Sequence, residues 1–441
     1  MAPAVVMVRA MQTTFFGWRV VAGAFVLATF GWGLGFYGPP VYLHQVQEER
    51  GWSTVLVSTA VTVHFLIGAL VVANLPGLYK RFGLPAITRT GTLMLALGVL
   101  GWALAREPWQ LLLATLFSGA GWVTMAAAAI NAIVAPWFAV KRPAALAMAY
   151  NGASIGGVVF SPLWVAAIGW LGFPMAALGV GIIMVIIVWL LCSLVFARTP
   201  QMLGQMADGE PMTAAVAATM NPARPVAPGG LWHDLRFLTL ATGMALGLFA
   251  QIGLIAHLFS LLVPTLGEQL SGLLMGASTA AAIGGRTLVG WLMPPGSDRR
   301  RIASASHVVQ IVGSLALIFA GGHVVALLIA GVLLFGAGIG NTTSLPPLIA
   351  QAQFDKADVP RVVPLIVAIG QGFYAFAPAV FGAIRALPAS STTLVFVAAA
   401  VLQGLAIVAF LAGRRVRYVP VHLGARLPRN ALMPSRKSAL A

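Results

Sequence analysis

One arginine stands inside a long apolar stretch of this sequence, in Ala-Ala-Ile-Gly-Gly-Arg286-Thr-Leu-Val-Gly. It precedes Pro294 by eight residues, which places it roughly 12 Å inward if the stretch is helical. A guanidinium stays charged and can hold a carboxylate through two parallel hydrogen bonds. A charge at membrane depth indicates a functional site, so we predict that Arg286 binds an anionic substrate. The alternative is that its side chain extends to the membrane edge or bonds to backbone carbonyls.

Acidic side chains are missing from the apolar stretches, because all ten lie at or beyond their ends. A proton relay through buried carboxylates is therefore excluded. Histidine is the remaining proton carrier, and the candidates are His64 and His257. Burial favours a neutral imidazole, whereas an arriving anion favours the protonated form. This pattern allows anion–proton symport, and the alternative for either residue is a hydrogen-bonded structural role.

Uncharged polar side chains complete the candidate site. Tyr37 is next to a Gly38-Pro39-Pro40 sequence, and such helix breaks are tolerated where protein or a water-filled cavity compensates. Further amides could orient a carboxylate or hydroxyl: Asn131, Asn151, Gln251, Asn341 and Gln371. Polar residues also hold membrane helices together, so helix packing is the alternative for each amide. A simple kink is the alternative at Tyr37.

The composition shows what surrounds these residues. Of 441 residues, 59% are hydrophobic and only 8% are charged, against about 25% charged residues in soluble proteins. The chain is therefore an integral membrane protein. Its net charge of +16 does not indicate nucleic-acid binding, because apolar stretches divide the basic residues into short clusters. A single cysteine, Cys192, excludes a disulfide framework and a thiolate metal site, and nothing in the sequence calls for a cofactor.

Twelve segments are long and apolar enough to cross a membrane as helices. They cover about 18–43, 54–78, 86–105, 109–136, 144–168, 172–196, 237–262, 269–293, 302–320, 323–347, 362–384 and 391–412. A stretch rich in proline and glycine, 198–236, divides them six and six. We therefore expect an all-α membrane protein with two six-helix pseudo-repeats. The expected domains are 1–197 and 237–413, with 198–236 as a cytoplasmic linker and 414–441 as a basic cytoplasmic tail.

Charge placement supports this count. If both termini are cytoplasmic, 22 of the 26 Lys and Arg residues fall on the cytoplasmic side, as the positive-inside rule requires. We expect a multi-pass plasma-membrane protein, in the inner membrane if the source is bacterial, with its tail against anionic lipid heads. Short basic turns follow the second and eighth segments, at Lys80-Arg81 and Asp298-Arg299. We predict that these two turns are gating loops.

Several motifs resemble those of a known family. They are Trp137-Phe-Ala-Val-Lys141-Arg142-Pro running on to Pro162, Gly35-Phe-Tyr37 followed by Gly51-Trp52-Ser53, and the Arg198-Thr-Pro200 to Asp208-Gly209 segment. Together they are similar to the major facilitator superfamily, and within it to the monocarboxylate and oxalate porters. The resemblance implies alternating access between two halves. Where that family usually has an acidic residue before its loop arginine, this chain has Lys80, and its eighth-span arginine matches Arg286.

These features favour one function and leave one alternative. We expect a secondary transporter for a small organic anion, a monocarboxylate, with coupling to protons left open. An exporter of amphipathic or drug-like compounds on the same fold is the alternative, which the 16 Met and 23 Phe residues would suit. An enzyme is disfavoured because no metal-spaced or acid–base cluster occurs in the membrane segments. ATP drive is disfavoured because there is no Walker-type loop.

Overall fold

A computed structural model describes residues 15–209, 230–293, 297–355, 358–387 and 391–414. Every regular element in this part of the chain is helical. Large apolar side chains face outward, among them Leu70, Trp170, Trp291 and Phe319 at 64%, 85%, 84% and 75% exposure. An apolar outer surface of this kind is stable only against another apolar phase. The helices are thus built for a lipid surrounding.

The first half of the chain forms eight numbered helices. They are α1 (Gly17–Gly35), α2 (Pro39–Arg50), α3 (Thr54–Phe82), α4 (Leu84–Leu104), α5 (Pro108–Trp122), α6 (Ala127–Val134), α7 (Arg142–Leu171) and α8 (Phe173–Leu191). A π-helical turn, Cys192–Phe196, extends α8. Two pairs, α1 with α2 and α5 with α6, each make one interrupted membrane crossing. This half therefore contains six crossings.

The second half begins with one very long helix. Its elements are α10 (Leu235–Leu292), α11 (Arg299–Ala320), α12 (Val325–Gln353), α13 (Val359–Tyr374), α14 (Ala377–Arg385) and α15 (Ser391–Ala412). The backbone of α10 leaves the helical region at Gly267, where φ is +72°, so its 58 residues make two crossings. The described part of the chain has eleven spans that are long and apolar enough to cross a membrane. Because α10 crosses twice, they confirm the predicted twelve crossings.

Single glycines make the tightest connections between helices. Gly83 alone separates α3 from α4, and Gly172 alone separates α7 from α8. Their φ angles are +81° and +74°, a region that is costly for residues with a Cβ atom. Consecutive helices joined in this way must run antiparallel and side by side.

The break between α1 and α2 follows directly from the Gly38-Pro39-Pro40 sequence. Pro39 and Pro40 supply no backbone N–H, so they fit the first turn of a helix and weaken the hydrogen bonding of the turn before them. Helix α1 therefore ends at Gly35 and α2 starts at Pro39. Tyr37 lies in the non-helical segment between them. The predicted helix break is present and puts this tyrosine at the middle of the crossing.

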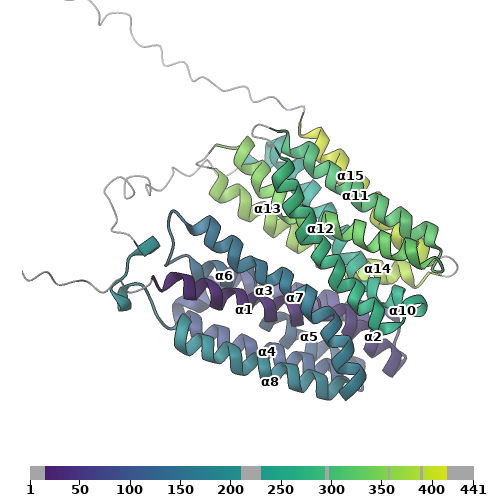
Figure 1. Ribbon diagram of the computed structural model, residues 1–441, viewed down its shortest axis with the longest axis horizontal. Helices are drawn as coiled ribbons and strands as arrows, with labels where there is room; N and C mark the ends of the chain where they lie inside the picture. The colour runs from purple at the N-terminus through teal and green to yellow at the C-terminus, as the bar shows by residue number, and fades with distance from the viewer. Residues whose placement is uncertain (1–14, 210–229, 294–296, 356–357, 388–390, 415–441) are drawn as a thin grey trace, which may run out of the picture.

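The helices form two groups that lie side by side, with α1 to α8 in one and α10 to α15 in the other (Figure 1). We call the end of the molecule that contains Phe196, Leu235 and Leu292 the linker end, and the opposite end, with Arg50 and Gly267, the far end. The groups converge at the far end, where α2 meets α10 and α14 meets α3. The predicted domain limits remain a prediction, since 210–229 and 415–441 lie outside the described residues.

A buried arginine binds four helices together at the linker end of the second group. Arg300 is 0% exposed and donates to the Arg236 carbonyl at 2.8 Å, Gln353 Oε1 at 3.0 Å and Thr239 Oγ1 at 3.1 Å. It also donates to the Phe410 carbonyl at 3.3 Å. These partners lie on α10, α12 and α15, so the charge on α11 is held by oxygen atoms of three neighbouring helices.

We predict that Arg300→Ala destabilises the purified protein, because it leaves buried carbonyl and amide oxygens without donors. Each unsatisfied buried group costs about 1–3 kcal/mol. Thermal unfolding followed by tryptophan fluorescence measures the loss. The adjacent Arg301→Ala is the matched control, because the Arg301 side chain is 69% exposed. An equal melting temperature for both variants would contradict the prediction.

Candidate functional site

Arg286 lies in the second crossing of α10, where it packs against α12. A Cβ atom at Gly340 on α12 would lie 3.1 Å from Arg286 Nε and 2.5 Å from the Ala282 carbonyl oxygen. Glycine at position 340 therefore makes the space that the guanidinium occupies. Arg286 Nε is buried and has no hydrogen-bond partner among the described residues. The arrangement leaves a cationic donor available to a ligand.

Tyr37 brings the first group of helices to this arginine. Its ring lies beside the Thr279 side chain on α10, and its hydroxyl is within electrostatic range of Arg286. A Cβ at Gly157 on α7 would lie 2.7 Å from both the Tyr37 ring and Thr279 Cγ2. Three crossings, one from the α1–α2 break and two from α7 and α10, therefore meet here. Two of the predicted site residues, Arg286 and Tyr37, are brought together.

No carboxylate compensates the charge on Arg286 within the described part of the chain, where the ion pairs of acidic residues involve other partners. A buried charge without a partner costs several kcal/mol. A bound anion would supply the missing negative charge and accept from Nε. The geometry of Arg286 and Tyr37 therefore suits a carboxylate placed at the junction of the two groups.

Two predicted amides lie in the second group, but neither has a described contact with Arg286. Asn341 follows Gly340 on α12, is 3% exposed, and its Oδ1 has no hydrogen-bond partner among the described residues. Gln371 is half-buried on α13. The unsatisfied oxygen of Asn341 could accept a hydrogen bond from a ligand or water. Gln371 stays a prediction without further support.

Asn131 is held within the first group instead. Its Nδ2 donates to the Ala127 carbonyl at 3.0 Å and to the Tyr150 hydroxyl. Tyr150 in turn donates to the same carbonyl at 3.0 Å. These bonds join α6 to α7 near the interruption of the α5–α6 crossing. The described contacts give Asn131 a packing role.

His64 supports the helix break that positions Tyr37. Its Nε2 lies 2.9 Å from the carbonyl oxygen of Gly35, and its Nδ1 lies 2.8 Å from Ser118 Oγ. A carbonyl oxygen only accepts, so Nε2 donates and Nδ1 is left to accept from the serine hydroxyl. The side chain is 1% exposed. Both ring nitrogens therefore have partners, and the imidazole links the last residue of α1 to Ser118 on α5.

His257 has a comparable place in the second group, with one nitrogen left over. Its Nε2 lies 3.0 Å from the Pro378 carbonyl oxygen at the start of α14. Its Nδ1 is buried and lacks a partner among the described residues. The nearest charge that acts on it belongs to Arg385. The structure places His257 at the far end, apart from the Arg286–Tyr37 contact described above.

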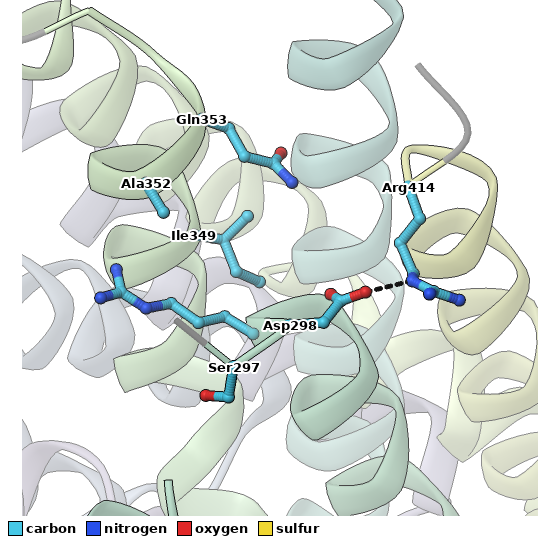
Figure 2. A pocket seen from close by; sticks show the side chains of 7 residues that line it. Ser297, Asp298, Ile349, Ala352, Gln353 and Arg414 are labelled. Carbon is cyan, nitrogen blue, oxygen red and sulfur yellow. Dashed lines mark hydrogen bonds and ion pairs between the residues drawn. The ribbon is translucent and has the colours of Figure 1, made fainter. Parts of the chain in front are cut away.

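The two predicted gating turns differ in their contacts. Lys80 and Arg81 are exposed at the end of α3, with the Arg81 guanidinium 5.0 Å from the centre of the Phe82 ring. Asp298 accepts from the amides of Arg300 and Arg301 at the start of α11 and pairs with Arg414. Figure 2 shows the Asp298 and Arg414 side chains meeting beside a pocket.

Arg299 also bonds within its own group, to the Leu348 carbonyl on α12. The described bonds of this turn thus stay inside the second group, and a gating role for either turn stays a prediction. Burial raises the pKa of Asp298, but hydrogen bonds from Arg414 and from the amides of Arg301 and Arg300 lower this pKa by more than burial raises it. The net effect is a pKa below the usual range.

Sequence reasoning missed a buried polar cluster in the second group. Gln251 Nε2 donates to Gln310 Oε1 at 2.8 Å and to Thr342 Oγ1 at 2.6 Å, and Gln403 Nε2 donates to Gln310 Oε1 at 3.0 Å. Gln251, a candidate for substrate contact, is thus bonded to other protein groups. The signal in the sequence was one glutamine in each of three apolar segments.

Comparisons with known proteins agree with this geometry. Two six-crossing groups of helices that meet around a central site are the architecture of many secondary transporters. The sequence pattern of the Major Facilitator Superfamily matches residues 20–378. The chain belongs to the Major Facilitator Superfamily. The proteins of this fold to which it is similar are transporters rather than enzymes.

Individual relatives are more distant. "MFS-type transporter 1" of Ophiocordyceps sp. (strain BCC 1869) is 32% identical over 195 residues, which is 43% of this chain and 42% of that protein. The chain thus matches under half the length of this curated relative. A D-xylose–proton symporter structure has a TM-score of 0.70 at 14% identity, over 90% of this chain and 97% of that one.

Two further solved structures share the fold. A bacterial homologue of the human lysosomal transporter Spinster, in an inward-facing and occupied conformation, has a TM-score of 0.68 at 14% identity, over 92% of this chain and all of that one. The nucleoside transporter NupG has a TM-score of 0.66 at 12% identity, over 90% and 100% of the two chains. At these identities the likeness shows the fold alone.

We predict that Gly340→Ala destabilises the protein by about 1–3 kcal/mol, the usual cost of overpacking, because the new methyl group meets the Ala282 carbonyl oxygen and Arg286 Nε. Thermal unfolding measures the effect. Gly284→Ala on α10, two residues before Arg286, is the control, since a Cβ there meets no atom within 4 Å. Loss of stability in both variants, or in neither, would contradict this packing argument.

The lowered pKa of Asp298 predicts a pH effect with a definite sign. A depressed carboxyl pKa stabilises the folded chain above the ordinary value of about 3.9, and this contribution is lost as pH falls through the folded-state pKa. Asp298→Asn should therefore melt below wild type at pH 7, and the gap should narrow as the pH falls below the ordinary carboxyl value of about 3.9. Asp355→Asn, which removes an exposed carboxylate at the same end, should show no such gap.

Proposed function

We propose that this protein is a secondary transporter that moves a small organic anion, a monocarboxylate, across the membrane by alternating access. The observation that supports this proposal is the placement of Arg286 and Tyr37 within electrostatic range of each other. It puts a half-buried guanidinium with a buried, unpartnered Nε at the junction of the two helix groups, on the side that faces a hydroxyl from the opposite group. A guanidinium and a phenol together match the oxygen atoms of one carboxylate.

The placement of the inter-group contacts supports alternating access. The Tyr37 ring lies beside Thr279, and towards the far end the Phe65 and Tyr374 rings pack at 5.7 Å between centroids. Beyond them Thr62 Oγ1 accepts from the Ala379 amide at 3.0 Å. These contacts close the far end, whereas the groups diverge towards the linker end in Figure 1. An anion would reach Arg286 from the linker end in this conformation.

We assign the linker end to the cytoplasm because basic residues concentrate there, as they do in cytoplasmic loops. In this orientation the conformation is open to the cytoplasm. Outward release of the anion, or its uptake, then requires the contacts beyond Tyr37 to separate while the linker ends approach each other. A rocking motion of two six-helix halves about a site near the membrane midplane has this geometry.

If transport is coupled to protons, His257 is the better candidate of the two histidines. Both nitrogens of His64 already have partners, whereas Nδ1 of His257 has none among the described residues. His257 also holds the Pro378 carbonyl at the start of α14, a helix that contacts the first group. Protonation of Nδ1 would thus act on the closed far end rather than on the anion itself.

The alternative function, export of amphipathic or drug-like compounds, has one observation in its favour. A small cavity between the groups is lined only by apolar side chains, with Phe36, Phe65 and Ile252 among them. Apolar walls of this kind suit a hydrophobic molecule. Arg286 favours the anion, because an apolar neutral substrate would leave its charge uncompensated.

The test is uptake of labelled short-chain monocarboxylates into liposomes that contain the purified protein, with and without an inward proton gradient. We expect Arg286→Ala to reduce uptake at least about 30-fold, because removing one partner of a desolvated charge pair costs about 2–5 kcal/mol. Arg286→Lys should recover only part of the rate, since lysine lacks the planar fork. Tyr37→Phe should raise KM.

Arg19→Ala serves as the control, because it removes an exposed arginine on α1 away from the junction. Normal uptake by a folded Arg286→Ala variant would show that the site is wrong. If wild-type protein moves none of the carboxylates but does move amphipathic dyes, the export function replaces the proposal.

A further inference from the structure

An ion pair joins the two helix groups at the far end. His44 Nε2 on α2 lies 3.8 Å from Glu268 Oε1 on α10. His44 is 7% exposed, whereas the Glu268 side chain is 46% exposed. Glu268 directly follows Gly267, where α10 turns back into the membrane. The pair therefore connects the first crossing of one group to the turn between two crossings of the other.

The charges around His44 come from both groups. Glu48 is one turn further along α2, Glu268 belongs to α10, and Arg385 ends α14; all three act electrostatically on the imidazole. The Phe259 ring packs edge-on against it, with 5.2 Å between centroids. Two carboxylates and one guanidinium thus face His44, so the local charge without its proton is −1. A protonated imidazole neutralises this excess, and a neutral one leaves it unpaired.

The neighbouring contacts between the groups carry no titratable group of this kind. The bond from the Ala379 amide to Thr62 Oγ1 and the Phe65–Tyr374 ring contact persist at any pH near neutrality. Imidazole changes its charge between about pH 5 and 8. His44 is therefore a direct contact between the groups whose strength can vary with pH, whereas His257 is bonded within the second group.

We propose that His44 and Glu268 form a pH-controlled latch that holds the far end closed when His44 is protonated. Loss of the proton removes the ionic attraction across the groups and leaves one net negative charge among Glu48, Glu268 and Arg385. The closed conformation then loses population to the one that opens at the far end. In the orientation proposed above, acid on the outside would favour the conformation open to the cytoplasm. The latch itself does not depend on which substrate is carried.

Electron-spin distance measurements in lipid nanodiscs test the latch without a substrate. Spin labels at Arg106→Cys and His323→Cys, both exposed at the far end of opposite groups, report the gap between them in a Cys192→Ser background. We expect the ratio of long to short distances to rise about two- to fivefold from pH 5.5 to pH 8, the range of a partly exposed ion pair.

Two variants separate the latch from other pH effects. His44→Gln and Glu268→Gln should each give the more open distribution at both pH values, with the pH dependence lost. Glu49→Gln is the matched control, because Glu49 lies on the same helix but pairs with Gln45 and Arg50, and it should behave as wild type. The same pH response in His44→Gln as in wild type, or no response in wild type, would overturn the proposal.

Discussion

A cation in an apolar interior is the constraint on which the rest of this structure depends. A guanidinium at membrane depth is costly unless it finds oxygen atoms, and the chain treats the buried Arg300 and the half-buried Arg286 in opposite ways. Arg300 receives four oxygen partners from neighbouring helices, so its charge is used to fix the second helix group. Arg286 keeps a buried Nε without a partner, so its charge remains available. This contrast separates a structural arginine from a binding one.

The helix break at Gly38-Pro39-Pro40 allows the first helix group to reach that charge. In an unbroken helix, the direction of the Tyr37 side chain would be set by its position in the helical turn alone. Here the tyrosine lies between two shorter helices, and His64 fixes the carbonyl of Gly35 just before the break. The glycine at 157 then leaves room for the ring. A proline pair, a histidine and a glycine from three crossings thus combine to position one hydroxyl.

The sequence was sufficient to predict the class of membrane protein and the number of crossings. It also predicted that Arg286 has no acidic side chain beside it in the apolar segments. Apolar length and charge placement determine these features, because they are set by the membrane itself. The roles of individual polar residues were not predictable. Gln251 and Gln371 look alike in the sequence, yet Gln251 is bonded inside the second group and Gln371 is only half-buried. Which face of a helix meets a neighbour depends on packing between distant segments, and hydropathy does not record it.

The single-glycine connections have a consequence for how the protein is made. Gly83 and Gly172 join neighbouring crossings with no loop between them, and Gly267 does the same inside α10. Two crossings connected so closely cannot enter the bilayer independently, so each pair must insert as a hairpin. The unit of biogenesis is then a helical hairpin whose tip is fixed by one residue. Lengthening such a tip would uncouple the insertion of its two helices before any effect on transport.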